Sequence, residues 1–561
     1  MIEPLPVKPL GDTAFVLRVA GESPATLAGS AATLAEAIRR EAPPGTVDVV
    51  PALDAVTVFY NIAQSGDPET FAASLRRIAG RLPREADGCA GTLHEIPVVY
   101  GGEGGPDLDE LCASHGLDRP AFIARHTAPA YVVQAIGFTP GFPYLGGLPP
   151  ELATPRRETP RPLVPAGSVG IGGAQTGIYP FATPGGWHIV GRTAVRLFDA
   201  DREPPALLRT GDRVRFVEAS GADQAAEARA VATPTTTTGE PVGPAMRIGR
   251  PGLMTTIQDL GRPGYRSLGV PLSGAADPLA LRLANLIVGN EEHTAGLECT
   301  LVGPELTFEC DAVVALTGGD FSGLPRFRPV RVAAGETISL GHARQGCRGY
   351  LAIAGGVQVR PQLGSRSTYV PARLSGLAGS LLRQGDRVPI EADSLVVRGR
   401  WSMSGDVAPL PPAAPLACEL RIISADDTAA EGRSLAGLSW RTSSRSDRMG
   451  VRLEGTPLAG GRADLVSAAV APGTIQLPPD GQPIILLADA QTIGGYAVVG
   501  HVIAVDLRLA AQLRPGDLVT FKPVTLAEAH AASHAQEATV AMLSQALAGR
   551  VCRQEGPESP T

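Results

Sequence analysis

The sequence predicts a mainly β protein of the α+β class, in which one small β-module is used at least twice. The first observation behind this prediction is the stretch 137–193, where glycine and proline recur every few residues with aromatic side chains between them. Such a stretch is not helical, because proline removes a backbone donor and glycine carries an entropy cost in a helix. It is typical of short strands joined by tight turns, as in a small barrel or sandwich.

The second observation is an internal repeat. The pattern Gly-Gly-aromatic-x-apolar-Val-Gly occurs at 185–191 and again at 494–500. Upstream, 166–171 aligns with 472–477, and downstream, 209–216 aligns with 514–521 through a shared Arg-x-Gly-Asp-x-Val. Three matches in the same order and at similar spacing indicate one β-module used twice. A further Arg-x-Gly-Asp-x-Val at 383–388 is weaker evidence for another strand that closes a barrel.

The first 90 residues alternate strand and helix patterns. Apolar runs predict strands at 14–19, 47–50, 55–60 and 96–100, and helical patterns predict helices at 25–40 and 68–79. The resulting order, β-α-β-β-α-β with 96–100 as the last strand, predicts a ferredoxin-like subdomain over 1–90.

The remaining boundaries follow from shifts in composition. We expect a β-barrel over 91–218, and a linker rich in threonine and proline over 219–244. The first part of a second large domain covers 245–406, and it contains a helix that Asp277 caps and that runs to Val288. The second β-module then covers 407–525, and a terminal helix and tail cover 526–561.

Composition excludes several classes of function. A net charge of −7 disfavours nucleic acid and anionic membranes as partners, and no apolar run approaches the roughly 20 residues that span a bilayer. With no signal-peptide pattern, the cytoplasm is the expected location. The seven cysteines contain no C-x-x-C and the nine histidines no H-E-x-x-H, so we expect no metal site. Lys8 and Lys522 are the only lysines, which excludes a Walker A loop and a biotin-bearing lysine.

Polar residues beside glycines are the candidate site residues of the first half. Arginines of the proline-rich loop could clamp a carboxylate or phosphate, although they could equally be surface residues. Two histidines could act as acid–base groups, with a structural role as the alternative. The candidates of this half are His126, Tyr144, Arg156, Arg161, Ser168, Gln175 and His188.

The second half offers four polar clusters. Asp489 directly follows the apolar run 484–487, so it lies at the end of a buried strand, where a carboxylate either functions or caps the strand. The candidates of this half are Gln258, Asp259 and Arg262, then Ser365, Arg366 and Ser367, then Arg448, and finally Gln476, Asp489, Gln491, Thr492 and Tyr496. We assign catalytic roles to His126, Arg366 and Asp489, and substrate or nucleotide binding to the others.

These motifs resemble two known families. The motifs at 137–145, 165–170, 175–180 and 184–187 resemble the B subunit of 5-oxoprolinase, also called allophanate hydrolase subunit 1. Those at 256–262, 363–368, 446–450 and 494–496 resemble the C subunit of 5-oxoprolinase, or allophanate hydrolase subunit 2. Together the two resemblances cover nearly the whole chain, which therefore looks like a natural B–C fusion.

The resemblance implies cyclophilin-like barrels and an enzyme component. It implies ATP-driven opening of 5-oxoproline to glutamate together with a separate A-type subunit, with Mg²⁺ expected alongside ATP and no covalently bound biotin. An oligomer is also expected. Two positions depart from the usual family pattern, the Ser-Ala-Ala of 467–469 and Ala490. These departures leave the identity of the small amide substrate open.

Two other functions fit the same resemblance. The paired modules are similar to the carboxyltransferase part of urea carboxylase, which passes a carboxyl group from carboxybiotin to urea or a related amide. Family members also resemble an inhibitor of a sensor histidine kinase and its antagonist. Fusion of both halves argues against this regulator, because it would tether the inhibitor to its antagonist.

Overall fold

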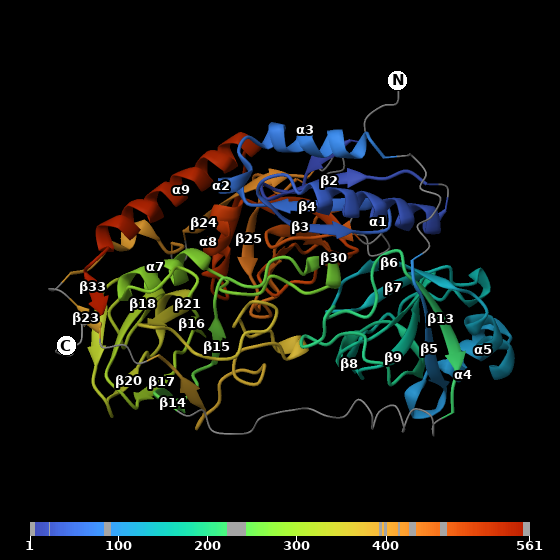
Figure 1. Cartoon of the computed structure of the whole chain (residues 1–561), viewed down its shortest axis with the longest axis horizontal. Helices are drawn as coiled ribbons and strands as arrows, with labels where there is room; N and C mark the ends of the chain where they lie inside the picture. The colour runs from blue at the N-terminus through green and yellow to red at the C-terminus, as the bar shows by residue number, and fades with distance from the viewer. Residues whose placement is uncertain are drawn as a thin grey trace, which may run out of the picture.

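The structure is a computed structural model that describes residues 6–21, 23–82, 91–220, 243–391, 395–397, 401–412, 416–425, 434–459 and 468–553. Most of the predicted linker and the last residues of the predicted tail lie outside these ranges. The larger strand assemblies of the described residues are an N-terminal sheet, two closed barrels and a pair of open sheets between the barrels in sequence (Figure 1). Among the described residues no helix has the length and apolar character to cross a membrane.

The N-terminal sheet has the order β1-β2-β4-β3. Its strands are β1 (Val7–Pro9), β2 (Ala14–Arg18), β3 (Thr46–Pro51) and β4 (Ala55–Tyr60), and its helices are α1 (Pro24–Glu41), α2 (Ile62–Ser65) and α3 (Pro68–Ala79). β4 lies between β2 and β3 and is antiparallel to both, which is the split β-α-β arrangement of a ferredoxin-like unit.

The predicted fourth strand of that unit is wrong. The segment 96–100 belongs to β5 (Leu93–Tyr100), which leaves the N-terminal sheet and pairs with strands of the first barrel. The edge beside β2 is instead covered by β1, through the register Val7 with Leu17. A strand's own sequence does not specify its partner, because pairing depends on long-range packing.

The first barrel closes in the order β10-β7-β6-β13-β5-β12-β9. Its strands are β5, β6 (Tyr131–Ile136), β7 (Pro143–Gly146), β9 (Ser168–Gly172), β10 (Gln175–Ile178), β12 (His188–Arg192) and β13 (Arg213–Glu218). A separate two-stranded sheet joins β8 (Arg161–Val164) and β11 (Thr183–Gly185), and helices α4 (Leu108–His115) and α5 (Arg119–Thr127) follow β5.

The second barrel repeats this connectivity strand for strand. It closes in the order β24-β31-β28-β29-β26-β25-β32, and the first and last strands of each barrel pair in parallel, β5 with β13 and β24 with β32. Its own two-stranded sheet, β27 (Ala468–Ala469) with β30 (Ile493–Gly494), occupies the position of β8 and β11 in the chain order. The predicted repeat is therefore confirmed. The barrel strands are β24 (Ala417–Ser424), β25 (Ser439–Thr442), β26 (Gly450–Glu454), β28 (Thr474–Leu477), β29 (Ile484–Leu486), β31 (Ala497–Val502) and β32 (Leu518–Pro523).

The segment between the barrels forms two open sheets around one apolar core. One has the order β20-β17-β14-β22, with β14 (Ala245–Arg250), β17 (Glu305–Phe308), β20 (Thr337–Ser339) and β22 (Arg387–Pro389). The other has the order β15-β16-β21-β18-β19, with β15 (Met254–Gln258), β16 (Gly296–Thr300), β18 (Ala312–Phe321), β19 (Pro329–Val332) and β21 (Ala343–Ile353). Helix α7 (Pro278–Val288) starts at its predicted cap, where Asp277 accepts from the Ala280 amide at 3.0 Å.

The third Arg-x-Gly-Asp pattern marks a turn and not a barrel. In all three copies the aspartate accepts from the arginine amide three residues earlier, at 2.9 Å for Asp212, 2.7 Å for Asp386 and 2.8 Å for Asp517. The glycine between them has a φ of +87° to +93°, which favours glycine. The strand that follows Asp386 is β22, in an open sheet.

The C-terminal helix α9 (Leu526–Leu547) ties the two ends of the chain together. Figure 1 shows it running from α2 toward α7 along one side of the molecule. Near its start His530 bonds to the Tyr60 hydroxyl and the Asp12 carbonyl, each at 3.0 Å. Farther along, Glu537 accepts two bonds of 2.7 Å from Arg282 of α7. Short α8 (Leu507–Ala511) lies between β31 and β32 in the chain, and β23 (Leu395–Val397) pairs with β33 (Val551–Arg553).

Candidate functional site

Asp259 organises a buried polar network in the second half. It follows β15, and its Oδ1 accepts from the hydroxyls of Ser365 and Ser367, the former at 2.7 Å. Its Oδ2 accepts from the backbone amide of Arg366 at 2.6 Å. One buried carboxylate thus holds the turn 363–368 against the end of β15, and brings together two predicted clusters that are about 100 residues apart in sequence.

Gln258 and Arg262 reach the same turn from either side of Asp259. Gln258 Nε2 donates to the Thr368 carbonyl at 3.2 Å, and Arg262 Nη2 donates to the neighbouring Ser367 carbonyl. Both side chains are fully buried. Gln258 Oε1 and Arg262 Nε and Nη1 have no hydrogen-bond partner within the protein. Burial lowers the pKa of Arg262, against the opposite effect of Asp259 and Asp489.

A buried ion network joins this region to the second barrel. Arg448 donates from Nε and Nη2 to Asp489, at 2.8 and 3.0 Å, and from Nη1 to Glu298. Burial alone would lower the pKa of Arg448, but the two carboxylates outweigh it and raise that pKa. Ser273 donates to Asp489 Oδ1 at 2.7 Å, so both carboxylate oxygens of Asp489 are engaged. This geometry suits positioning of loops better than proton transfer by Asp489.

Glu298 was not predicted, although it completes this network. Its Oε2 accepts from the Tyr350 hydroxyl at 2.8 Å and from the Ala276 amide at 2.9 Å. Burial raises its pKa, but Arg448 and Arg348 exert the larger combined effect, and the pKa of Glu298 is lowered. The available signal was a lone carboxylate inside the apolar run 295–302, since such a charge is rarely buried without a partner.

The other candidates of the second half lie around β28 and β30, except Arg366, which lies on the 363–368 turn. Gln476 and Thr492 are buried, and Gln476 Nε2 and Thr492 Oγ1 have no partner within the protein. Gln491 is half-buried, and Tyr496 is 38% exposed. Arg366 is half-buried, and its Nε donates to the Val359 carbonyl at 3.0 Å.

Several candidates of the first half lie beside the small sheet of β8 and β11. We call Arg156, Arg157 and Arg161 the arginine cluster. Arg161 donates to buried Asp107 at 2.5 Å and Arg157 to the same oxygen at 3.5 Å, while Arg156 is exposed. Arg157 Nε and Arg161 Nη1 have no partner within the protein. Asp107 was not predicted as a site residue, and it also accepts from the Ile189 amide at 2.6 Å.

The remaining first-half candidates surround this cluster or line the barrel. Tyr144 is buried against Phe142 and Trp187, and burial raises its pKa. Gln175 donates to Gln134 at 2.7 Å, and half-buried His188 bonds through Nε2 to the Pro155 carbonyl at 3.0 Å. Ser168 is buried in β9.

His126 lies away from both groups, inside the first barrel. It is fully buried, stacks on Phe216 at 4.8 Å, and bonds to the Tyr100 hydroxyl at 2.8 Å and the Thr176 hydroxyl at 3.1 Å. Burial lowers its pKa to about 3. Both ring nitrogens are therefore engaged in the core, and we do not retain the catalytic role expected for His126.

The two halves meet at their glycine-rich motifs. The Gly141 amide donates to the Leu268 carbonyl at 2.8 Å. A Cβ on Gly137 would lie 2.2 Å from Ile493, and one on Gly269 would lie 2.5 Å from the Thr139 carbonyl, so backbones approach closely here. One apolar cluster combines Phe59 of the N-terminal sheet, Phe142 and Trp187 of the first barrel, and Ile493 of the second. The junction therefore unites motifs from both halves of the chain.

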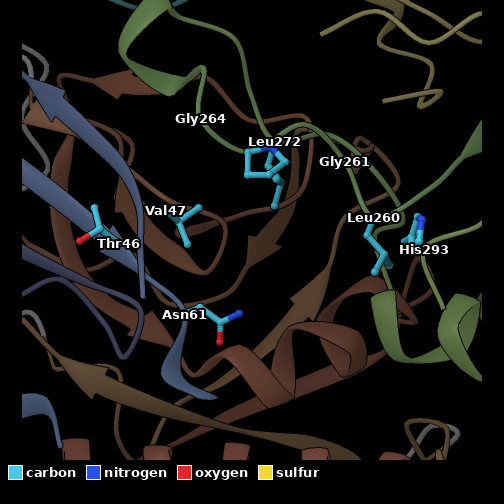
Figure 2. Close-up of a pocket in the computed structure, with 9 residues that line it drawn as sticks. Thr46, Val47, Asn61, Leu260, Gly261, Gly264, Leu272 and His293 are labelled. Carbon is cyan, nitrogen blue, oxygen red and sulfur yellow. The ribbon is translucent and has the colours of Figure 1, made fainter. Parts of the chain in front are cut away.

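A hollow of about 610 Å³ opens near this junction, between β3 and the loop 260–272 (Figure 2). Asp259 and Arg262 do not line it, although their neighbours Leu260, Gly261 and Pro263 do. Its lining consists of Thr46, Val47, Asn61, Leu260, Gly261, Pro263, Gly264, Leu272 and His293.

Comparison with known proteins identifies both halves. Residues 5–208 match the family model for carboxyltransferase domain, subdomain C and D, and residues 268–523 match subdomain A and B. The B subunit of 5-oxoprolinase from Escherichia coli O157:H7 is 47% identical over 210 residues, which span 37% of this chain and 93% of that protein. The C subunit from Escherichia coli K12 is 38% identical over 304 residues, 52% of this chain and 95% of that protein. The chain belongs to the family of the 5-oxoprolinase B and C subunits.

The two families are joined here in one chain, B first and C second, as the motifs predicted. A crystal structure of TTHA0988 is 37% identical, covers 91% of this chain and 99% of that one, and superposes with a TM-score of 0.76. The urea amidolyase of Saccharomyces cerevisiae is 32% identical over 324 residues, but these span only 18% of that protein. Membership in the 5-oxoprolinase family implies a component of an enzyme.

Proposed function

We propose that this chain is the fused B–C component of an ATP-dependent 5-oxoprolinase, which opens 5-oxoproline to glutamate together with a separate A-type subunit. The observation that carries the proposal is that near-full-length B and C relatives of this name align with consecutive parts of one chain. The contact between the motifs of the two halves supports one joint site. The barrels are proposed to be cyclophilin-like, and the working assembly an oligomer in the cytoplasm.

The chemistry required is activation of a poor electrophile. A lactam carbonyl resists attack by water until charge on its oxygen is stabilised or the oxygen is converted to a leaving group. Arg262 offers buried donors for such an oxygen, and Asp259 holds the turn of Ser365 and Ser367 beside it. Asp489 and Arg448 are proposed to position the loops, and Arg366, half-buried on the same turn, to contact the substrate.

The arginine cluster is the group of described residues that best fits a nucleotide. Exposed Arg156 and the unpartnered Arg157 Nε and Arg161 Nη1 could donate to phosphate oxygens, a role for which guanidinium geometry is suited. ATP would supply the phosphoryl group that activates the lactam. Within the described ranges no group of three or more His, Cys, Asp or Glu side chains could hold a metal ion, so Mg²⁺ is proposed to arrive with the nucleotide.

The test is release of glutamate from 5-oxoproline with ATP and Mg²⁺, using this chain with and without a purified A-type subunit. We expect glutamate and ADP in equal amounts, and only when both proteins are present. Absence of turnover with a partner that is active alongside authentic, separate B and C proteins would contradict the proposal.

A biotin-dependent carboxyltransferase is the second candidate, because both matched family models describe carboxyltransferase subdomains. In that case the chain would accept a carboxyl group from a separate carboxybiotin carrier and pass it to a small amide. Dependence on bicarbonate and inhibition by avidin would distinguish this activity from the oxoprolinase activity, which needs neither carrier nor bicarbonate.

A further inference from the structure

Gln258 and Arg262 bind the same turn, and each leaves polar side-chain atoms unpartnered. The two side chains are anchored on the consecutive carbonyls of Thr368 and Ser367. Because a carbonyl can only accept, Gln258 must direct its Nε2 toward Thr368, which leaves Oε1 as a free acceptor. The Arg262 Nε and Nη1 groups remain free donors on the side chain that binds the preceding carbonyl. Buried polar atoms without a partner are unfavourable, so such a set calls for a partner.

The charges around these atoms decide what kind of partner fits. An anion would accept from Arg262 but could donate nothing to Gln258 Oε1. The carboxylates of Asp259 and Asp489, which both act on Arg262, would also repel it. A neutral molecule with one donor and one acceptor on the same edge satisfies both side chains. A lactam has such an edge, because its ring holds the amide cis, with N–H and C=O side by side.

We propose that Gln258 and Arg262 bind the amide edge of a small lactam. Gln258 Oε1 accepts the ring N–H, and the Arg262 guanidinium donates to the carbonyl oxygen. This assignment rests on the proposed function and deepens it, since it names the part of the substrate that each residue contacts. Both side chains are fully buried, so the ligand enters when the 363–368 turn, which Asp259 holds, moves aside.

The experiment is calorimetric binding of 5-oxoproline and of its lactone analogue to the full chain, with and without the A-type partner. The lactone has an oxygen in place of the ring N–H, so the donor is lost with little change in shape. For the wild type we expect the lactone to bind about tenfold more weakly or worse. In Gln258→Met the difference should vanish, because no acceptor remains for the N–H. Gln345→Met is the matched control: Gln345 also donates to a carbonyl, of Pro411 at 2.9 Å, and should keep the wild-type ratio.

Equal affinity of the two ligands for the wild type, an unchanged ratio in Gln258→Met, or no saturable binding of 5-oxoproline would each overturn the assignment. If Gln258→Met does not fold, the wild-type ratio of the two affinities decides, since the lactone tests the ring N–H without a variant. Glutamate release separates this inference from the proposed function. Selective binding without turnover supports the lactam site and contradicts the function, whereas turnover with equal affinities does the reverse.

Discussion

At the scale of single residues, the Arg448–Asp489 pair illustrates how this protein stabilises buried charge. Each partner is at least 93% buried as a side chain, and each also bonds to a further group, Glu298 or Ser273. We expect Asp489→Ala to lower the free energy of unfolding by about 3–5 kcal/mol, because the buried charge of Arg448 would lose one of its two carboxylate partners. Urea denaturation measures this change in the free energy of unfolding. Asp109→Asn, at an exposed ion pair with Arg119, is the control and should leave the midpoint unchanged. A similar midpoint for both variants would show that the buried pair adds no stability.

Two buried histidines predict that the barrels lose stability in acid. Burial lowers the pKa of His126 to about 3 and that of His501 to about 4. A base whose pKa is lower in the folded state takes up protons on unfolding, so stability is complete above the unfolded pKa of about 6.5 and falls as the pH drops toward the folded values. We expect the unfolding free energy to decrease by up to about 1.4 kcal/mol per pH unit for each histidine over this range.

Replacing one histidine tests this dependence. His126→Gln should make the loss between pH 6 and pH 4 shallower in urea titrations, while His501 maintains the rest. An identical pH slope in the variant and the wild type would mean that His126 is not the source of the acid sensitivity.

At the scale of elements, the contact between the 137–141 and 268–269 turns depends on glycine. Gly269 has a φ of +75°, and an added Cβ would lie 2.5 Å from the Thr139 carbonyl. Gly269→Ala should therefore strain the turn and also push the two halves apart. Gly264→Ala is a matched control, because Gly264 has a φ of +93° but nothing within 4 Å of an added Cβ.

We expect Gly264→Ala to cost only the roughly 1–2 kcal/mol of a left-handed non-glycine residue. Gly269→Ala should cost clearly more and should split thermal unfolding into two transitions, as measured by calorimetry. Equal losses for the two variants would show that backbone strain alone, without the contact between halves, explains the effect.

At this scale the sequence predicted most elements well. The helices at 68–79 and 278–288 and the strand at 55–60 occur as predicted, because their caps and apolar periodicity are local signals. The assignment of β5 failed because 93–100 is apolar enough for either sheet, and only packing against β12 and β13 places it in the barrel.

At the scale of the whole molecule, Asp12 joins the N-terminal sheet to the second barrel. It is 2% exposed and accepts from the Ala504 amide at 2.9 Å. Burial raises its pKa from 3.8 to about 6, with Asp506 adding to the effect and Arg421 and hydrogen bonds from Ala504 opposing it. A carboxyl group whose pKa is raised by folding binds its proton more tightly in the folded state. Its contribution to stability is therefore complete below pH 3.8 and is lost as the pH rises to about 6.

Asp12→Asn should consequently be more stable than the wild type at pH 8, by up to about 3 kcal/mol, and similar to it at pH 4. Asparagine can still accept from Ala504, so the docking contact remains. Urea denaturation at both pH values measures the difference, with exposed Glu419→Gln on the same barrel as the control. A variant less stable at pH 8 would show that the charged carboxylate is favourable in the interface.

The sequence by itself determined the repeated barrel, most local elements and the family, because turn glycines, caps and apolar periods act over a few residues. Only the tertiary structure decided which polar residues meet. It placed His126 in a core and joined Asp259 to Ser365 and Ser367. It also revealed Glu298 as a partner of Arg448 and Asp107 as a partner of Arg161. These outcomes depend on contacts between segments 50 to 150 residues apart, and the pairing of buried charges and donors over such separations leaves no pattern in the local sequence.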